Sequence, residues 1–204
     1  MRGVEDEEDI VLTIFSNLNL RSIIILYIKS LGDLFSCLPS TLPNLEKLVL
    51  SGWLWLSNQG LNEILNRSRR NLTVLDLSRS NITGVGVEEG VNSLSNLEVL
   101  NLSWCLNLTD GGLKEVLRVS GSKLRVLGVS YTYITGQGFK DGVSLPMLEE
   151  LDLGGYRQLT YSGLLEILSI SVNRLKNMLV TRRISTAYRM KLSSQYPSVQ
   201  FYYL

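Results

Sequence analysis

The sequence lacks histidine entirely and has only two cysteines among its 204 residues. Without an imidazole, the chain cannot build Ser-His-Asp or Cys-His nucleophile systems or a histidine metal site. Cys37 and Cys105 stand 68 positions apart, and two isolated thiols do not make a zinc site. We therefore expect a protein that is not an enzyme and that uses no metal and no cofactor.

Strong net charge and long apolar runs are also missing. The formal net charge is +1, which gives no general attraction to nucleic acid or to a membrane surface. No stretch reaches the roughly 18 unbroken apolar residues of a membrane span. An acidic run, Glu5 to Asp9, stands where a secretory signal would be basic. Cysteines this sparse do not suit a disulfide-sealed secreted protein, so we expect reduced thiols and a location in the cytoplasm or the nucleus.

What the sequence does contain is one recurring pattern: an apolar residue, two variable residues, an apolar residue, one variable residue and a third apolar residue. Successive starts are 24 to 27 residues apart. Self-similarity at such a period is typical of a solenoid, in which each unit packs on its neighbours. Seven full repeats and a truncated eighth begin at Leu20, Leu45, Leu72, Leu97, Leu124, Leu148, Leu175 and Val199.

The repeat over residues 97–123 illustrates the expected local structure. Leu100 and Leu102 should point inward, because alternate side chains of a strand face opposite sides. Thr109 supplies a helix N-cap, and apolar residues at i, i+3 and i+4 then predict a buried helix face. The repeats at 72–96 and 124–147 carry G-x-G there instead, which predicts short or irregular helices. The helix anchors expected in the three long repeats are Leu61, Ile64, Leu65, Leu113, Val116, Leu117, Leu164, Ile167 and Leu168.

These units predict an α/β solenoid with one parallel sheet and one layer of helices. Strands stack about 4.8 Å apart and helices about 10 Å apart, so the stack should bend, with a concave sheet and convex helices. We expect an N-terminal helical cap over residues 1–19 and a single repeat domain over residues 20–204, in which long and short repeats alternate. Val199, Tyr202 and Leu204 keep the repeat spacing and predict a truncated last strand, which Pro197, Phe201, Tyr202 and Tyr203 help to close.

The segments SWCLNLTDGGLKEVL (103–117) and GGYRQLTYSGLLEIL (154–168) resemble the cysteine-containing class of leucine-rich repeat. This class is typical of F-box/leucine-rich repeat proteins and is ribonuclease-inhibitor-like. The resemblance covers residues 20–204. It implies a protein-binding solenoid, and in F-box relatives one that recognises the substrate of a cullin-type ubiquitin ligase. The chain departs from that plan because only 19 residues precede the first repeat, too few for an F-box. The class cysteine is present only at Cys105 and is replaced elsewhere by Trp53, Ser80, Thr132 and Tyr156.

Outward strand positions, aligned across the repeats, predict a binding surface on the concave face. Arg79, Trp104 and Tyr131 follow the strand at the same position of three consecutive repeats, so they should lie side by side. Trp, Tyr and Arg are the residues most enriched in binding hot spots. The alternative is that Trp104 packs over the sheet edge while Arg79 pairs with Asp76. The expected partner-binding residues are Asp76, Arg79, Asn101, Trp104, Tyr131, Asp152 and Arg182.

Three further features bear on that surface. Asp76 and Asp152 stand three repeats apart, about 14 Å at the strand spacing, which is too far for the carboxylate pair of a glycosidase. We expect core packing for both Trp53 and Trp55, with Trp55 the better candidate for exposure. The last 38 residues contain no Asp or Glu, so this basic end is either a solvated face or a docking patch for an acidic partner.

The sequence thus predicts a monomeric recognition module that binds a protein or peptide on its concave face, with no nucleic acid and no membrane as partner. One alternative makes it the substrate-recognition part of a cullin-type ubiquitin ligase. Another is a fragment of an extracellular immune-type receptor, which would carry glycans on its Asn-x-Ser/Thr tripeptides. Those tripeptides start at Asn66, Asn71, Asn81, Asn101 and Asn107.

Overall fold

The computed structural model describes residues 21–24, 40–68, 71–86, 94–156, 159–171 and 173–204, and every structural statement below concerns these residues. The helical cap expected over residues 1–19 lies outside them. Within them the chain repeats the strand–turn–helix order that the periodic sequence predicts.

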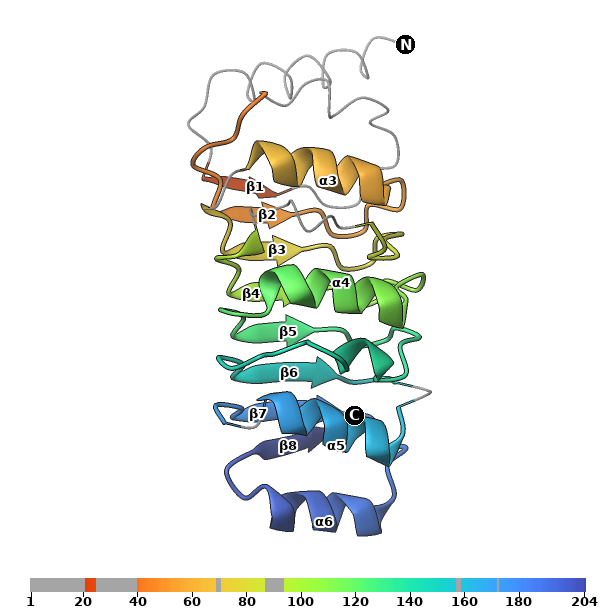
Figure 1. The fold of residues 1–204 in the computed structure, drawn as a ribbon. Coiled ribbons are helices and arrows are strands. Elements are labelled where there is room, and N and C mark those ends of the chain that lie inside the picture. The colour runs from red at the N-terminus through yellow and green to blue at the C-terminus, as the bar shows by residue number, and fades with distance from the viewer. Residues whose placement is uncertain (1–20, 25–39, 69–70, 87–93, 157–158, 172) are drawn as a thin grey trace.

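Eight short parallel strands form one open sheet, and their order in space is their order in the sequence. Equivalent repeat positions are paired, so that Leu75 lies beside Leu100 and Leu100 beside Leu127. Figure 1 shows the strands stacked like rungs, with their carboxyl ends all at one edge of the sheet. The strands are β1 (Ser22–Ile24), β2 (Lys47–Val49), β3 (Val74–Asp76), β4 (Val99–Asn101), β5 (Val126–Gly128), β6 (Glu150–Leu153), β7 (Asn177–Val180) and β8 (Gln200–Tyr203).

The core lies between the sheet and the helices and continues from repeat to repeat. The three apolar positions of the pattern supply its sheet side: Leu97, Leu100 and Leu102 are at most 1% exposed. Leu113 and Leu117 close the same layer from the helix side. Truncating one fully buried leucine to alanine costs about 2–5 kcal/mol, so the periodic leucines hold both the strand face and the stacking of repeats.

Four α-helices lie on the other side of the sheet (Figure 1): α3 (Asn58–Arg67), α4 (Asp110–Ser120), α5 (Tyr161–Ser171) and α6 (Thr186–Gln195). All nine expected helix anchors are buried in α3, α4 and α5. The predicted N-cap is confirmed, since the Thr109 hydroxyl accepts the Gly112 N–H at 3.0 Å. No helix in the described part of the chain is long and apolar enough to cross a bilayer.

One of the two short repeats differs from the long ones as expected. In the repeat at 124–147, the helix is reduced to the single 3₁₀ turn η3 (Gln137–Phe139). Gly136 precedes this turn with a φ of 101°, in the left-handed region that favours glycine. In the other short repeat, residues 87–93 lie outside the described part.

The register predicted for the last strand is wrong by one residue. Met178 pairs with Phe201 and Val180 with Tyr203, so Phe201 and Tyr203 occupy the inward positions. Phe201 is 8% exposed, whereas Tyr202 is 51% and Leu204 55% exposed. Side chains alternate with a period of two, so a slip of one residue exchanges the two faces of the strand. The core takes Phe201 because β8 aligns on β7, not on the repeat spacing.

Candidate binding surface

The strand face carries the predicted central column of outward side chains. The strand pairing places Asp76 beside Asn101, Asn101 beside Gly128 and Gly128 beside Asp152. A shallow groove of about 520 Å³ runs across these strands, and Val49, Leu179 and Tyr202 line its two ends. The sheet therefore brings together Asp76, Asn101 and Asp152, as the periodic alignment predicts.

These three polar side chains each bond the backbone of their own turn. Oδ1 of Asp76 accepts the Ser78 N–H at 2.8 Å, and Oδ1 of Asn101 accepts the Ser103 N–H at 3.1 Å. Asp152 accepts the Gly154 N–H at 2.8 Å in the same way. Asn and Asp favour such turns because a side-chain oxygen can stand in for a backbone acceptor. Sequence reasoning assigned them to a partner, but these bonds also give them a role in shaping the turn after each strand.

The residue after this turn has a left-handed backbone in five consecutive repeats. Glycine occupies the position at Gly52 and Gly155, where φ is 79° and 68°. Arg79, Trp104 and Tyr131 occupy it between them, with φ of 58°, 63° and 54°. A left-handed conformation costs an L-residue about 1–2 kcal/mol. Three of the four non-glycine residues with positive φ in the described part are therefore the ones singled out from the sequence.

Arg79, Trp104 and Tyr131 form a continuous stack, which we call the aromatic ladder. The Arg79 guanidinium carbon lies 5.3 Å from the centre of the Trp104 ring. The Trp104 and Tyr131 rings are stacked, with centroids 4.1 Å apart and planes inclined by 10°. Tyr131 in turn lies on Gly155, where a β-carbon would come within 2.5 Å of the tyrosine ring. The ladder therefore spans three repeats and ends on a glycine.

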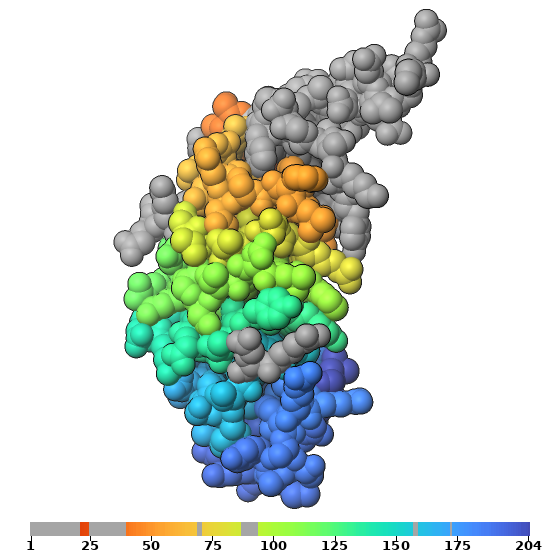
Figure 2. All heavy atoms as spheres, turned by 90° about the vertical axis from the view of Figure 1, so that its right-hand side faces the viewer, coloured from red at the N-terminus to blue at the C-terminus, as the bar shows by residue number. Residues whose placement is uncertain are grey.

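Backbone hydrogen bonds hold the ladder at the spacing of the sheet. The N–H of Arg79 donates to the Ser103 carbonyl at 2.9 Å, and that of Trp104 donates to the Ser130 carbonyl at 2.8 Å. Tyr131 donates likewise to Gly154 at 2.9 Å. These bonds continue the parallel pairing beyond the last residue of each strand. The side chains are thus mounted on rigid backbone along the carboxyl edge of the sheet, the edge that faces the viewer in Figure 2.

A small hollow opens beside the ladder, and we call it the notch. Its volume is about 200 Å³. Trp104 and Tyr131 are 42% and 40% exposed, and their neighbours Leu106 and Tyr133 are 52% and 51% exposed. Sequence reasoning missed Leu106 and Tyr133, although both lie two positions after a ladder residue and could have been aligned in the same way. The notch is lined by Trp104, Leu106, Tyr131, Thr132, Tyr133 and Gly155.

The structure also decides the burial of Trp53 and Trp55 and the partner of Asp76. Trp53 is buried as expected, but core packing is wrong for Trp55, which is 75% exposed. Trp53, unlike Trp55, lies at an inward position of its loop. Cys105 occupies the same position two repeats later. The alternative pairing of Arg79 with Asp76 is not formed, because the second oxygen of Asp76 accepts the Asn101 amide at 3.2 Å.

Arg182 follows Gly155 in the column but does not contact the ladder. Its Nε donates to the Tyr203 carbonyl at 3.1 Å and its backbone N–H donates to the Leu204 carbonyl at 2.7 Å. A second arginine, Arg189 of α6, donates to the Arg182 carbonyl and stacks 4.7 Å from the centre of the Tyr203 ring. Arg182 therefore belongs to the closure of the last repeat, with its charged group at the same edge of the sheet.

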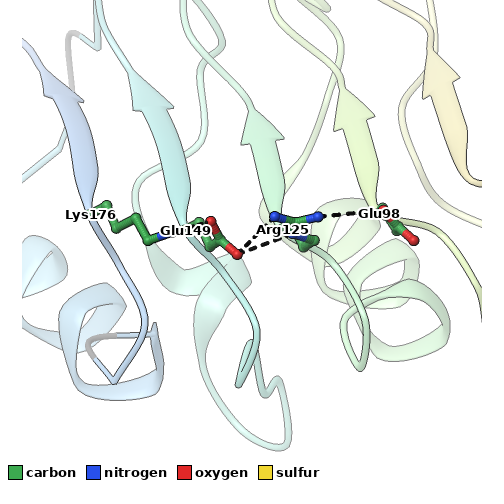
Figure 3. Close-up of polar contacts among 4 residues, drawn as sticks. All are labelled: Glu98, Arg125, Glu149 and Lys176. Carbon is green, nitrogen blue, oxygen red and sulfur yellow. Dashed lines mark hydrogen bonds and ion pairs between the residues drawn. The ribbon is translucent and has the colours of Figure 1, made fainter.

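The amino edge of the sheet has a different character, with alternating charges that pair across repeats. Figure 3 shows Arg125 between Glu98 and Glu149, at 3.9 and 3.0 Å, and Lys176 on the far side of Glu149 at 2.6 Å. Lys176 first, and then Arg125, hold the pKa of Glu149 below its usual value. These four residues, the charge ladder, neutralise one another, whereas the carboxyl edge combines exposed aromatics with arginine.

The cysteine position is a core position in this chain. Cys105 is fully buried and its thiol donates to the Leu77 carbonyl at 3.1 Å. Burial raises the pKa of this thiol, so it stays protonated. The residues that replace it elsewhere are buried too: Trp53, Ser80, Thr132 and Tyr156. The position thus accepts side chains of very different size, and Tyr156 leaves its hydroxyl without a hydrogen-bond partner among the described residues.

Repeats in register, with a parallel sheet on one side and helices on the other, define an α/β repeat solenoid. The particular class follows from comparison with known proteins. A model of the family described as "Leucine Rich repeat" matches residues 69–89 and 93–117. Together with the fold, this match supports a leucine-rich repeat protein, and the chain folds as a leucine-rich repeat solenoid. Its assignment to the cysteine-containing class stays a prediction.

A solved structure shares this architecture. The chain is similar to one from the Rad7 and Elc1 complex of yeast, with a TM-score of 0.61 and 18% identity, over 97% of this chain and 57% of that one. It therefore spans little more than half the length of that relative. An internalin of Listeria monocytogenes is similar at a TM-score of 0.48 and 16% identity, over 96% of this chain and 67% of that one. A search of curated proteins finds no match.

Proposed function

We propose that this protein is a recognition module that binds a protein or peptide at the aromatic ladder and the adjoining strand-face groove. The observation that carries the proposal is the exposed stack of Arg79, Trp104 and Tyr131 on left-handed backbone. These residue types dominate the energy of protein interfaces, and here they stand together on a rigid edge. The module acts without a cofactor and without chemistry of its own.

The cost of the ladder supports a role beyond folding. Glycine serves the same position at Gly52 and Gly155, so the turn itself does not need a large side chain. Three bulky residues there carry about 1–2 kcal/mol of backbone strain each. Strain of this kind gathers at ligand-binding sites, where the surroundings hold it in place. The two rings, which are 42% and 40% exposed, offer a partner apolar surface to cover.

The test is a paired pull-down from native cell extract with the full chain and the double variant Trp104→Gly/Tyr131→Gly as baits. Glycine is the structurally matched replacement because the chain itself uses it at this position. Trp55→Ala, which removes an even more exposed indole from another repeat, is the control. We expect a protein that wild type and the control capture and the double variant does not. Equal capture by all three baits would place the site on the convex helices or at the basic C-terminal end.

A narrower form of the proposal is the substrate-recognition part of a cullin-type ubiquitin ligase. The repeat segments 103–117 and 154–168, which resemble the cysteine-containing class, support it, as does similarity to a chain that is solved in complex with Elc1. The same pull-down tests this idea, because cullin-ligase subunits should then appear among the captured proteins. Their absence would leave only the general recognition module.

A monomer in the cytoplasm or the nucleus remains part of the proposal. The asparagines of three tripeptides form hydrogen bonds between repeats. The Asn107 side chain donates to Asn81. Asn71 likewise donates to the Pro43 carbonyl. These contacts explain the asparagines structurally without glycans. Mass spectrometry of natively made protein that finds glycan on Asn66 or Asn107 would favour the extracellular receptor, and light scattering tests the monomer.

A further inference from the structure

The described residues of the loops at the carboxyl edge of the sheet include arginine but no acidic residue. The described parts of these loops are residues 51–56, 78–82, 103–108, 130–134, 154–156 and 181–185. Their charged residues are Arg79, Arg182 and Arg183, and none of these forms an ion pair with a described carboxylate. The amino edge, by contrast, balances its charges within the charge ladder. The edge that carries the aromatic ladder is therefore positive and uncompensated.

Arg79 has its donor groups free for a ligand. Its guanidinium lies over the Trp104 ring, and it makes no side-chain hydrogen bond to a described residue. A stacked guanidinium uses its flat face, while its N–H donors point outward in its plane. A carboxylate accepts two parallel hydrogen bonds from such a fork. The ladder thus holds one oriented carboxylate-binding group next to two exposed aromatic rings.

The notch supplies the second half of the site. Its walls are the rings and side chains of Trp104, Leu106, Tyr131 and Tyr133, and its volume of about 200 Å³ suits one large apolar side chain. The residues that line the notch lie one to three strands after Arg79 in the stack, and Tyr131, in the middle of them, lies two strands after it. At about 4.8 Å per strand, Arg79 and Tyr131 are roughly 10 Å apart. An extended peptide covers that distance with about three to four residues.

We infer that the partner presents an extended acidic segment that runs along the carboxyl edge. Its carboxylate pairs with Arg79, and a large apolar side chain about three to four residues away enters the notch. This inference rests on the proposed function, whose site it uses, and adds the chemistry of the partner. Charge complementarity carries it: the described loops of this edge hold three arginines without an ion pair and no Asp or Glu, and such a surface selects a negative segment.

Single-stranded nucleic acid fits the same residue types less well. Bases stack on open ring faces, yet the ladder covers its own faces, since Trp104 lies between Arg79 and Tyr131 and Tyr131 lies on Gly155. The groove beside the ladder is lined by three carboxylates, Asp76, Glu150 and Asp152, against the single cation Lys47. These carboxylates would repel any anionic segment that enters the groove, so the acidic peptide stays on the edge, and the covered ring faces are what disfavour nucleic acid.

The experiment is selection of a random 12-residue phage-displayed library on four full-length baits of confirmed fold. The baits are wild type, Arg79→Glu, Trp104→Gly/Tyr131→Gly and the control Arg174→Glu. Arg174 is an exposed cation just before the repeat start Leu175, near the amino edge, so the control repeats the charge change away from the ladder. Wild type and the control should enrich peptides with Asp or Glu three to four residues from an aromatic residue, Leu or Pro. A synthetic peptide from that pool should lose about tenfold in affinity on Arg79→Glu, which should select Lys or Arg instead.

The outcomes separate this inference from the proposed function. Peptides that depend on Trp104 and Tyr131 but show no acidic preference, and bind Arg79→Glu as well as wild type, would leave the binding site standing and overturn the inference. Peptides that the double-glycine variant binds unchanged would overturn both. Absence of enrichment on wild type contradicts the inference, as does an oligothymidylate 20-mer that binds wild type more tightly than any selected peptide and loses affinity on Arg79→Glu.

Discussion

At the scale of the residue, one backbone position decides the character of the carboxyl edge of the sheet. In five consecutive repeats the turn after the strand ends in a left-handed residue, which is glycine at Gly52 and Gly155 and a large side chain in the three repeats between them. Side chains on this conformation project along the edge of the sheet and stack on one another. The glycine at the end is as much a part of the ladder as the rings, because Tyr131 occupies the space where a β-carbon would be.

Gly155→Ala should destabilise the protein and displace Tyr131. The left-handed φ of 68° costs alanine about 1 kcal/mol, and the new β-carbon would meet the ring at 2.5 Å. We expect a loss of about 1–2 kcal/mol in urea unfolding and a change in the near-ultraviolet circular dichroism of the stack. In the Tyr131→Gly background the same substitution should lose only the backbone part. Equal losses in both backgrounds would show that the ring does not rest on Gly155.

Tyr156→Phe should stabilise the protein, increasingly so at alkaline pH. The ring is buried and its hydroxyl has no partner among the described residues, so removing the oxygen should gain up to about 1 kcal/mol. Burial holds the pKa of Tyr156 well above its usual value. Above about pH 10 the unfolded chain ionises while the folded one does not, so wild type loses stability there. Urea melts from pH 7 to pH 11 should therefore diverge; parallel curves would contradict the buried, protonated phenol.

At the scale of the element, the contact between a long repeat and the short one before it depends on glycine. α4 begins with Asp110-Gly111-Gly112, and a β-carbon on Gly112 would lie 2.0 Å from the Thr83 carbonyl oxygen. That oxygen belongs to the backbone and cannot turn away. Asp110 ties the same helix start to the next short repeat, since its carboxylate accepts the N–H groups of Thr135 and Gly138.

Gly112→Ala and Gly111→Ala make a matched pair in adjacent positions. Alanine at Gly112 must push the helix off the Thr83 loop, at a cost of roughly 3 kcal/mol. Alanine at Gly111 meets nothing closer than 4.0 Å and should gain about 0.5 kcal/mol from helix propensity. Thermal unfolding of both variants beside wild type measures the difference. Similar melting temperatures for the two would mean that α4 does not pack this closely.

The register of the last strand allows a second matched pair. Phe201→Ala removes an inward ring and should cost about 3 kcal/mol. Tyr202→Ala removes an outward one and should change stability by less than about 0.5 kcal/mol. Chemical denaturation distinguishes the observed register from the one expected from the repeat spacing. In the expected register Tyr202 would be inward, so Tyr202→Ala would lose more stability than Phe201→Ala.

At the scale of the whole molecule, the two edges of the sheet differ in the chemistry of their side chains. The charge ladder of the amino edge links four successive repeats through Glu98, Arg125, Glu149 and Lys176 (Figure 3). The carboxyl edge presents aromatic rings on a backbone that those repeats hold at a constant spacing. A solenoid gains its stability from contacts between neighbouring repeats. Ion pairs between repeats at the amino edge therefore also stabilise the spacing of the same repeats at the carboxyl edge.

Glu149→Gln should lower stability at neutral pH and have little effect in strong acid. The pKa of Glu149 is lowered in the folded state by Lys176 and Arg125. Its contribution is therefore complete above the unfolded pKa, about 4.3, and disappears as pH falls through the lower folded value. Urea melts at pH 7 and pH 2.5 test this, and added salt should shrink the difference at pH 7. A difference that persists unchanged at pH 2.5 would rule out the ion pairs as its source.

The period of the apolar residues by itself determined the parallel sheet, the inward leucines and the helix faces, because repeats of similar length stack in register. The same regularity predicted that Arg79, Trp104 and Tyr131 would meet. Only the tertiary structure placed them on left-handed backbone, since a strained φ depends on the hydrogen bonds of the neighbouring repeats. It likewise decided that Trp53 is buried while Trp55 is exposed. The register of β8 could not be predicted from the sequence, because Phe201 to Leu204 are all apolar or aromatic and no polar residue marks the outward face. The pairing of β8 with β7 decides which of these rings enter the core.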